Sequence, residues 1–315
     1  MKRAAFILFA VMIGLFGISC ASAEANSTPE ILLVPAEWNR PAAHPGRVET
    51  FEYAAGSDTK TAYVYLPYGY DESPDARYNI LYFMHGGGGW AGQFYNRSYA
   101  LNDILDHAIE SGEIAPLIVV TPSFYPSDDS DSSVSNAAGL VAVFHEEFLH
   151  DLMPAVETHY RTWAESGDPA ALEASRDHRA FGGFSMGSVT TWYQFLNALD
   201  DVRYFLPFSG DCWALGQMGG RNQSDRTAAY LADHVSGHPY GNDFYIYAMT
   251  GESDIAYDAM AGQIAAMKEC DVFRFGASPA EGNISFGVLD GATHDYTYYR
   301  NYIYSALKTI WPAAE

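Results

Sequence analysis

Short, continuously apolar segments alternate with segments of helical periodicity, and this alternation constrains the fold more than any other feature. Residues 78–84 read YNILYFM and residues 117–121 read LIVVT, and both are rich in β-branched or aromatic side chains. Strands of this composition are typically covered on both faces, as in a parallel sheet. The sequence therefore predicts a central sheet buried between helices.

The same alternation continues to the end of the chain. We expect further strands at residues 180–184, 204–208, 244–250 and 284–289, and helices at residues 100–110, 138–160, 187–199, 256–268 and 298–310. Strands that alternate with helices require a parallel sheet with helices on both faces. Residues 47–53 and 61–66 instead alternate polar with apolar or aromatic side chains, which indicates an antiparallel N-terminal hairpin. The predicted fold class is thus α/β, with a mostly parallel central sheet.

Two polar segments interrupt this rhythm. Residues 123–139 are rich in Ser and Asp, and residues 210–242 are rich in Gly, His and polar side chains. We expect both to be long loops near the substrate, because α/β enzymes bind substrates in loops after sheet strands. With no repeat or linker in the pattern, residues 47–315 are expected to form a single domain, preceded by an extension at residues 24–46.

The first 23 residues have the pattern of a secretory signal peptide. Lys2 and Arg3 precede an apolar stretch at residues 4–18, and the sequence ASA ends at Ala23. We expect export and cleavage after Ala23. The alternative is a lipoprotein signal at Cys20, which is less favoured because the preceding GIS matches a leucine-led lipobox poorly.

The charge of the chain excludes two classes of partner. Asp and Glu number 39 against 17 Lys and Arg, a net charge of −22, which repels phosphate backbones and anionic lipid surfaces. Outside the N-terminus no apolar run approaches the ~20 residues of a membrane span. We therefore expect no nucleic-acid partner and no membrane span, whereas neutral polysaccharides or esters remain open as substrates.

The sharpest motif is G-x-S-x-G at residues 183–187, which follows a predicted strand and opens a predicted helix. Flanking glycines permit a tight turn that exposes the serine hydroxyl and aims helix N–H groups at an oxyanion. A flexible Gly/Ser loop is the alternative interpretation of the motif alone. Its setting between strand and helix favours Ser185 as a catalytic nucleophile.

A serine nucleophile needs a base and a carboxylate, and this type of fold supplies them in the order Ser, acid, His. Asp254 follows the strand at residues 244–250, and His294 follows the last strand. We expect His294 to be the general base and Asp254 to orient it. Glu252 is the rival carboxylate, and Asp254 could instead cap the following helix.

A glycine-rich element, HGGGGW at residues 85–90, follows the strand at residues 78–84. Without side chains, its backbone can approach a substrate carbonyl, so the N–H groups of Gly87 and Met186 are the candidate oxyanion hole. A glycine-rich turn with a structural histidine is the alternative.

No metal or cofactor is expected. His145 and His150 are five residues apart, so they do not share a helical face as a zinc pair would. Neither a dinucleotide-binding glycine motif nor a Walker motif occurs. Once the signal is removed, Cys212 and Cys270 remain, and in an oxidising compartment they could close a disulfide or stay as two partly buried thiols.

Together these segments resemble an α/β-hydrolase of the feruloyl esterase and acetyl xylan esterase group, carbohydrate esterase family 1, related to esterase D. The residues that carry the resemblance are YFMHGGGG (82–89), IVVTP (118–122), HRAFGGFSMGS (178–188), FSGDCW (208–213), TGESD (250–254) and GATHD (291–295). The catalytic triad of that family falls on Ser185, Asp254 and His294.

The resemblance implies a secreted enzyme that cleaves hydroxycinnamoyl esters of plant arabinoxylan. Trp213 and Trp90 are candidate substrate contacts, since flat aromatic walls suit a cinnamoyl ring or a sugar face. Ordinary packing is the alternative for each. Three other functions remain open: an esterase or acyltransferase for another acyl group, such as an acetyl xylan or general carboxylesterase; a catalytically silent hydrolase fold used for binding; and a serine peptidase.

Overall fold

The computed structural model of the protein describes residues 29–127 and 134–314. The expected signal peptide at residues 1–23, with the lipoprotein alternative at Cys20, lies outside the described residues, as do the first five residues of the expected extension. Across the two described stretches, no helix combines the length and apolar character needed to span a bilayer.

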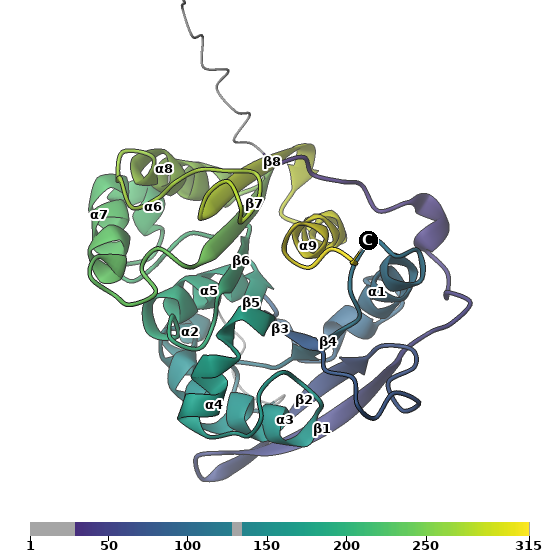
Figure 1. The fold of residues 1–315 in the computed structure, drawn as a ribbon. Helices are drawn as coiled ribbons and strands as arrows, with labels where there is room; N and C mark the ends of the chain where they lie inside the picture. Colours follow the sequence, from purple (N-terminus) through teal and green to yellow (C-terminus); the bar gives the residue numbers. More distant parts are fainter. Residues whose placement is uncertain (1–28, 128–133, 315) are drawn as a thin grey trace, which may run out of the picture.

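Eight strands in the described part of the chain form one sheet, in the order β1-β2-β4-β3-β5-β6-β7-β8 (Figure 1). They are β1 (Arg47–Ala55), β2 (Asp58–Leu66), β3 (Asn79–Met84), β4 (Leu117–Thr121), β5 (Arg179–Phe184), β6 (Tyr204–Phe208), β7 (Tyr245–Ser253) and β8 (Ile284–Thr293). The hairpin β1–β2 and the pair β2–β4 are antiparallel, and the other neighbours are parallel. The predicted α/β fold, with its antiparallel hairpin, is confirmed.

Helices cover both faces of the sheet. They are α1 (Leu101–Glu110), α2 (Val134–Glu147), α3 (Met153–His159), α4 (Pro169–Ala174), α5 (Met186–Asn197), α6 (Gly219–Asn222), α7 (Ser224–Val235), α8 (Tyr257–Met267) and α9 (Tyr296–Ile310). Short 3-10 turns occupy Ala36–Trp38, Gln93–Tyr95 and Arg176–His178. Helices α1 and α9 pack on one face, and α2, α5, α7 and α8 pack on the other (Figure 1). Each face thus has its own apolar core.

The predicted element boundaries agree best with the structure where strands are buried on both faces. Strands β4 and β6 begin and end where the sequence predicts, and every residue in them is buried. The helix predicted at residues 138–160 is instead α2 and α3 joined by a π-helical turn at Phe148–Leu152. The prediction of one long loop at residues 210–242 was wrong, because α6 and α7 lie within it. Helix α7 is amphipathic, with its buried residues at helical spacing, and it was missed because the segment around it is rich in Gly, His and polar side chains.

Cys212 and Cys270 are not joined, so the disulfide left open by the sequence is not formed and the two-thiol interpretation holds. Cys212 is buried just after β6, where burial raises the pKa of its thiol to about 12. Cys270 follows the end of α8, and its Sγ donates to the carbonyl of Ala266 at 3.7 Å. The two thiols therefore lie in separate environments.

A fully buried ion pair anchors the start of β5. Arg179, the first residue of that strand, donates from Nη2 to Oε2 of Glu157 on α3 at 2.8 Å, and its Nε contacts the other carboxylate oxygen. Both side chains are almost completely inaccessible to solvent. Each of these buried charges stabilises the other, because either charge alone would be unpaired and inaccessible to water.

We expect Arg179→Met to destabilise the protein by about 3–5 kcal/mol, since it leaves the Glu157 carboxylate buried and unpaired. The free energy of unfolding in urea measures this. Arg47→Met, which removes the exposed pairs with Asp71 and Glu49, is the control and should cost about 1 kcal/mol or less. Equal losses in the two variants would contradict this account of the buried pair.

Candidate active site

The chain turns sharply between β5 and α5, and Ser185 is the residue at the turn. Its backbone angles, φ 57° and ψ −117°, are in a region that costs a residue with a side chain about 1–3 kcal/mol. A Cβ atom on Gly183 or Gly187 would lie 2.7 or 2.2 Å from the carbonyl oxygen of Met84, so neither glycine can carry one. The turn therefore depends on both glycines of the motif.

Ser185, His294 and Asp254 form a hydrogen-bonded row at the carboxyl edge of the sheet. His294 follows β8, and its Nε2 lies 2.8 Å from Ser185 Oγ. Its Nδ1 lies 2.7 Å from Oδ1 of Asp254, which follows β7. With Nδ1–H donating to the carboxylate, Nε2 is free to accept the serine hydroxyl proton. The structure thus brings together the three residues selected from the sequence.

Asp254 also holds the start of α8. Its Oδ1 accepts a hydrogen bond from the N–H of Ala256 at 2.7 Å, but Ala256 and not Asp254 is the N-cap residue of that helix. Burial alone would raise its pKa, but the hydrogen bonds from His294 and Ala256 outweigh this and lower it below the usual value. Asp254 is therefore ionised at neutral pH. The rival Glu252 is exposed, and its carboxylate accepts from the N–H of Gly291 instead.

The glycine-rich loop after β3 leaves one backbone N–H without an acceptor. The N–H of Gly86 donates to the hydroxyl of Tyr296 at 2.5 Å, and that of Gly88 donates to the hydroxyl of Tyr125 at 3.0 Å. The N–H of Gly89 donates to the carbonyl of Gly86 within the loop. Among the described residues, the Gly87 N–H has no acceptor.

Met186 presents a second such N–H. As the first residue of α5 it has no intrahelical acceptor, and no other acceptor is found for it within the described part of the chain. Gly87 and Met186 both border the cavity that contains the Ser185 side chain. Two unpaired donors beside a nucleophile are the geometry that an oxyanion requires.

His85 supports this loop rather than the row. It is fully buried, its Nδ1 lies 2.8 Å from the carbonyl of Gly86 and its Nε2 lies 2.8 Å from Oγ of Ser123. Burial lowers the pKa of His85 to about 4, so the ring is neutral at physiological pH. His85 therefore has a structural role in the loop that contains Gly87.

A cavity of about 390 Å³ opens beside Ser185, with a mostly apolar wall. Trp213 borders it, and the indole N–H of Trp213 donates to Oδ1 of Asp211 at 2.9 Å. The other oxygen of Asp211 accepts from the N–H of Gly220 at 2.8 Å. The tryptophan ring is thereby held in one orientation as a flat wall.

Trp90, the other candidate substrate contact, is not brought to this cavity. It is 43% exposed and packs edge-on against Tyr63, with ring centroids 5.6 Å apart. Sequence reasoning also missed Tyr296, whose hydroxyl pins the glycine-rich loop. No sequence motif marks Tyr296. The one available signal was its position two residues after His294.

Comparison with known proteins identifies relatives of the chain. A family model described as "Putative esterase" matches residues 55–310. "Endo-1,4-beta-xylanase Y" of Acetivibrio thermocellus is 42% identical over 274 residues, covering 87% of this chain and 24% of that protein. "Endo-1,4-beta-xylanase/feruloyl esterase" of Xylanibacter ruminicola is 29% identical over 145 residues, covering 45% and 18%. The chain spans a quarter or less of the length of these two relatives.

Solved structures are similar over nearly the whole chain. A serine-to-alanine mutant of the feruloyl esterase module from Clostridium thermocellum, complexed with sinapinate, is 40% identical with a TM-score of 0.81, covering 93% of this chain and 98% of that one. A ferulic acid esterase from Anaeromyces mucronatus is 18% identical with a TM-score of 0.66, covering 90% and 97%, and shows the fold alone. Because the family model described as "Putative esterase" matches residues 55–310, the chain belongs to that esterase family.

Proposed function

We propose that this protein is a secreted serine esterase that hydrolyses feruloyl or p-coumaroyl esters on plant arabinoxylan or its oligosaccharides. The observation that carries the proposal is the row of Ser185, His294 and Asp254 beside an apolar cavity with two unpaired N–H groups. The 40% identical feruloyl esterase module that binds sinapinate supports the acyl group. The signal-peptide pattern at residues 1–23 supports export.

The first half of the reaction forms an acyl-enzyme. Ser185 Oγ attacks the ester carbonyl carbon while His294 Nε2 takes the hydroxyl proton, and Asp254 stabilises the imidazolium that results. The N–H groups of Gly87 and Met186 donate to the negative oxygen of the tetrahedral intermediate. His294 then gives its proton to the departing sugar oxygen, and the carbon–oxygen bond to the sugar breaks.

The second half releases the acid. Water takes the place of the sugar alcohol, His294 removes a proton from it, and the resulting hydroxide attacks the acyl carbon. The same two N–H groups stabilise the second tetrahedral intermediate. Its collapse returns the proton from His294 to Ser185 Oγ and frees the hydroxycinnamic acid. Every step uses side chains and backbone of this chain, with no cofactor.

We expect Ser185→Ala to lower kcat on methyl ferulate by about 10⁶-fold, since the acyl-enzyme cannot form. Initial rates on methyl ferulate, methyl p-coumarate, methyl sinapate, 4-nitrophenyl acetate and acetylated xylan test this together with the acyl preference. Ser98→Ala, at an exposed serine, is the matched control and should leave the rates unchanged.

Two of the alternative functions, the esterase for another acyl group and the silent binding protein, have their own signatures in that panel. Activity on acetyl esters alone would keep the serine mechanism but make the protein a deacetylase or general carboxylesterase. Rates that do not depend on Ser185 would overturn the mechanism. No turnover of any ester would leave a catalytically silent binding protein.

Trp213→Ala should raise the KM for methyl ferulate by about tenfold, because an aromatic wall of the cavity is lost. Turnover of 4-nitrophenyl acetate, whose acyl group is too small to need that wall, should change by about twofold or less. Steady-state kinetics on both esters provide the comparison. A proportional loss on both would show that Trp213 supports the site in general and does not select the acyl group.

Tyr296→Phe should lower kcat by about 10- to 100-fold, because Gly86 loses the acceptor that holds the oxyanion loop. An unsatisfied N–H there costs about 1–3 kcal/mol, which the free energy of unfolding reports. Tyr298→Phe on the same helix, whose hydroxyl makes no bond to the loop, is the control. Unchanged kcat in Tyr296→Phe would contradict this role for its hydroxyl.

A further inference from the structure

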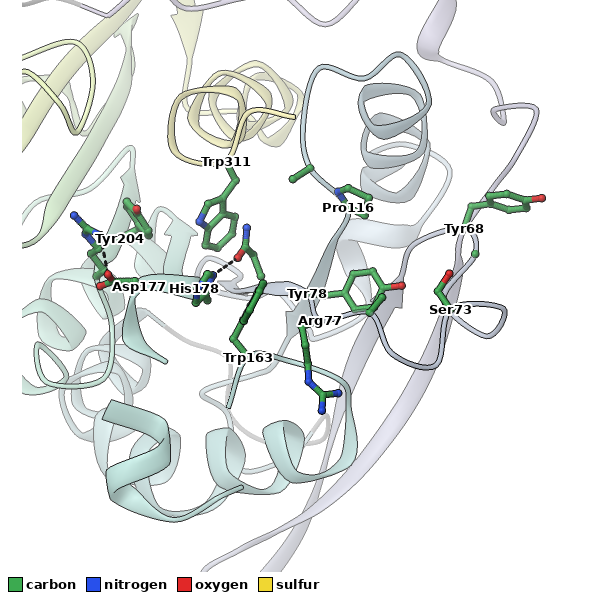
Figure 2. Close-up of a pocket in the computed structure, with 15 residues that line it drawn as sticks. Tyr68, Ser73, Arg77, Tyr78, Pro116, Trp163, Asp177, His178, Tyr204 and Trp311 are labelled. Carbon is green, nitrogen blue, oxygen red and sulfur yellow. Dashed lines mark hydrogen bonds and ion pairs between the residues drawn. The ribbon is translucent and has the colours of Figure 1, made fainter. Parts of the chain in front are cut away.

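A second cavity, of about 740 Å³, lies at the opposite edge of the sheet from Ser185. Its wall is built where parallel strands begin: Asn79 is the first residue of β3, Tyr204 is the first of β6, and His178 directly precedes β5 (Figure 2). Ser185 follows the other end of β5, and six residues of strand span about 20 Å. The cavity is therefore separate from the candidate active site.

An exposed and well-braced tryptophan forms part of this cavity. Trp163 is 47% exposed, and its ring stacks on that of His178 with centroids 4.3 Å apart and planes 16° from parallel. His178 is itself fixed, since its Nδ1 donates to Oδ1 of Asn79 at 2.7 Å. An apolar ring held in one orientation at the surface is a preformed platform for another flat apolar face.

The cavity is long and open. Figure 2 shows its residues spread from Asp177 and Tyr204 at one end, past His178, Trp163 and Trp311, to Tyr78, Ser73 and Tyr68 at the other. Tyr68 borders the far end and is 58% exposed, with its ring turned outward against that of His44 at a centroid distance of 4.9 Å. An exposed ring in an open trough that continues beyond it on both sides suits an extended chain of several similar units better than one compact ligand.

Polar groups between the rings remain available to a ligand. Nε2 of His178, Nδ2 of Asn79 and the hydroxyl of Ser73 have no hydrogen-bond partner within residues 29–127 and 134–314. Burial lowers the pKa of His178, so at neutral pH its Nε2 is an acceptor. The cavity thus combines donors and acceptors with apolar rings, which is the chemistry of a sugar, with hydroxyl edges and a C–H face.

Two arginines, Arg77 and Arg203, border the cavity, but the net charge of the chain disfavours an anionic ligand. The guanidinium of Arg203 is engaged by Asp177 at 3.0 Å and by Asp243 at 2.9 Å. The chain as a whole carries a net charge of −22, which repels anions. A neutral polysaccharide is not repelled by this charge and does not require a free cationic side chain.

We propose that this cavity is a second carbohydrate-binding site, which holds a neutral stretch of xylan-type polysaccharide while the ester is cleaved at the other edge of the sheet. The choice of xylan rests on the proposed function. Two sites on one protein that bind the same polymer raise each other's effective concentration, so the enzyme stays on its substrate between cleavages.

Binding to alkali-treated arabinoxylan tests the site apart from catalysis, because that polymer has no ester left for Ser185. In affinity gel electrophoresis, Trp163→Ala and Tyr68→Ala should each bind about tenfold more weakly than the parent protein. Tyr230→Ala, at a tyrosine that is 44% exposed on α7, is the matched control and should bind as the parent does. Absence of binding by the parent, or binding by both cavity variants as tight as that of the parent, would overturn the proposal.

Turnover of two substrates completes the test. In Trp163→Ala, kcat/KM on methyl ferulate should stay within about twofold of the parent value. Activity on feruloylated arabinoxylan should fall below that of the parent. Equal losses on both substrates would overturn the proposal, since they indicate damage to the fold or to the esterase site. Tyr68→Ala, at a more exposed side chain, provides the same comparison if Trp163→Ala fails to fold.

Discussion

The close approach of two backbone segments at Ser185 is the constraint on which the site depends. Gly183 and Gly187 lie so near the carbonyl of Met84 that neither can carry a Cβ atom. This contact presses the end of β5 against the end of β3. The N–H of Met186 and the loop that contains Gly87 therefore face one cavity, although about a hundred residues separate them in the chain.

Tyrosine hydroxyls then determine which loop amide stays free. Tyr296 and Tyr125 accept the N–H groups of Gly86 and Gly88, so Gly87 alone offers an unpaired donor among the glycines of the described loop. Tyr296 stands two residues after His294, at the start of α9. The base and the oxyanion loop are thus tied to the same short segment, and a shift of that segment moves both together.

Local pattern and strand order explain what could be predicted from the sequence. Strands β4 and β6 were bounded correctly because residues buried on both faces leave an uninterrupted apolar run. Ser185, Asp254 and His294 could be selected because each follows a strand, and the carboxyl ends of parallel strands meet at one edge. The contact of Trp90 with Tyr63 of β2 could not be predicted, because no local pattern records a contact between segments distant in the sequence.

The sheet also separates the two sites that we propose. Strand β5 has the buried pair of Arg179 and Glu157 at its first residue and the strained turn at Ser185 after its last. His178, next to Arg179, is rigid for the same reason that Ser185 is: both adjoin a strand whose every residue is buried. The coupling that we propose between the sites is one of local concentration, because a polymer held near His178 keeps its ester groups in the neighbourhood of Ser185.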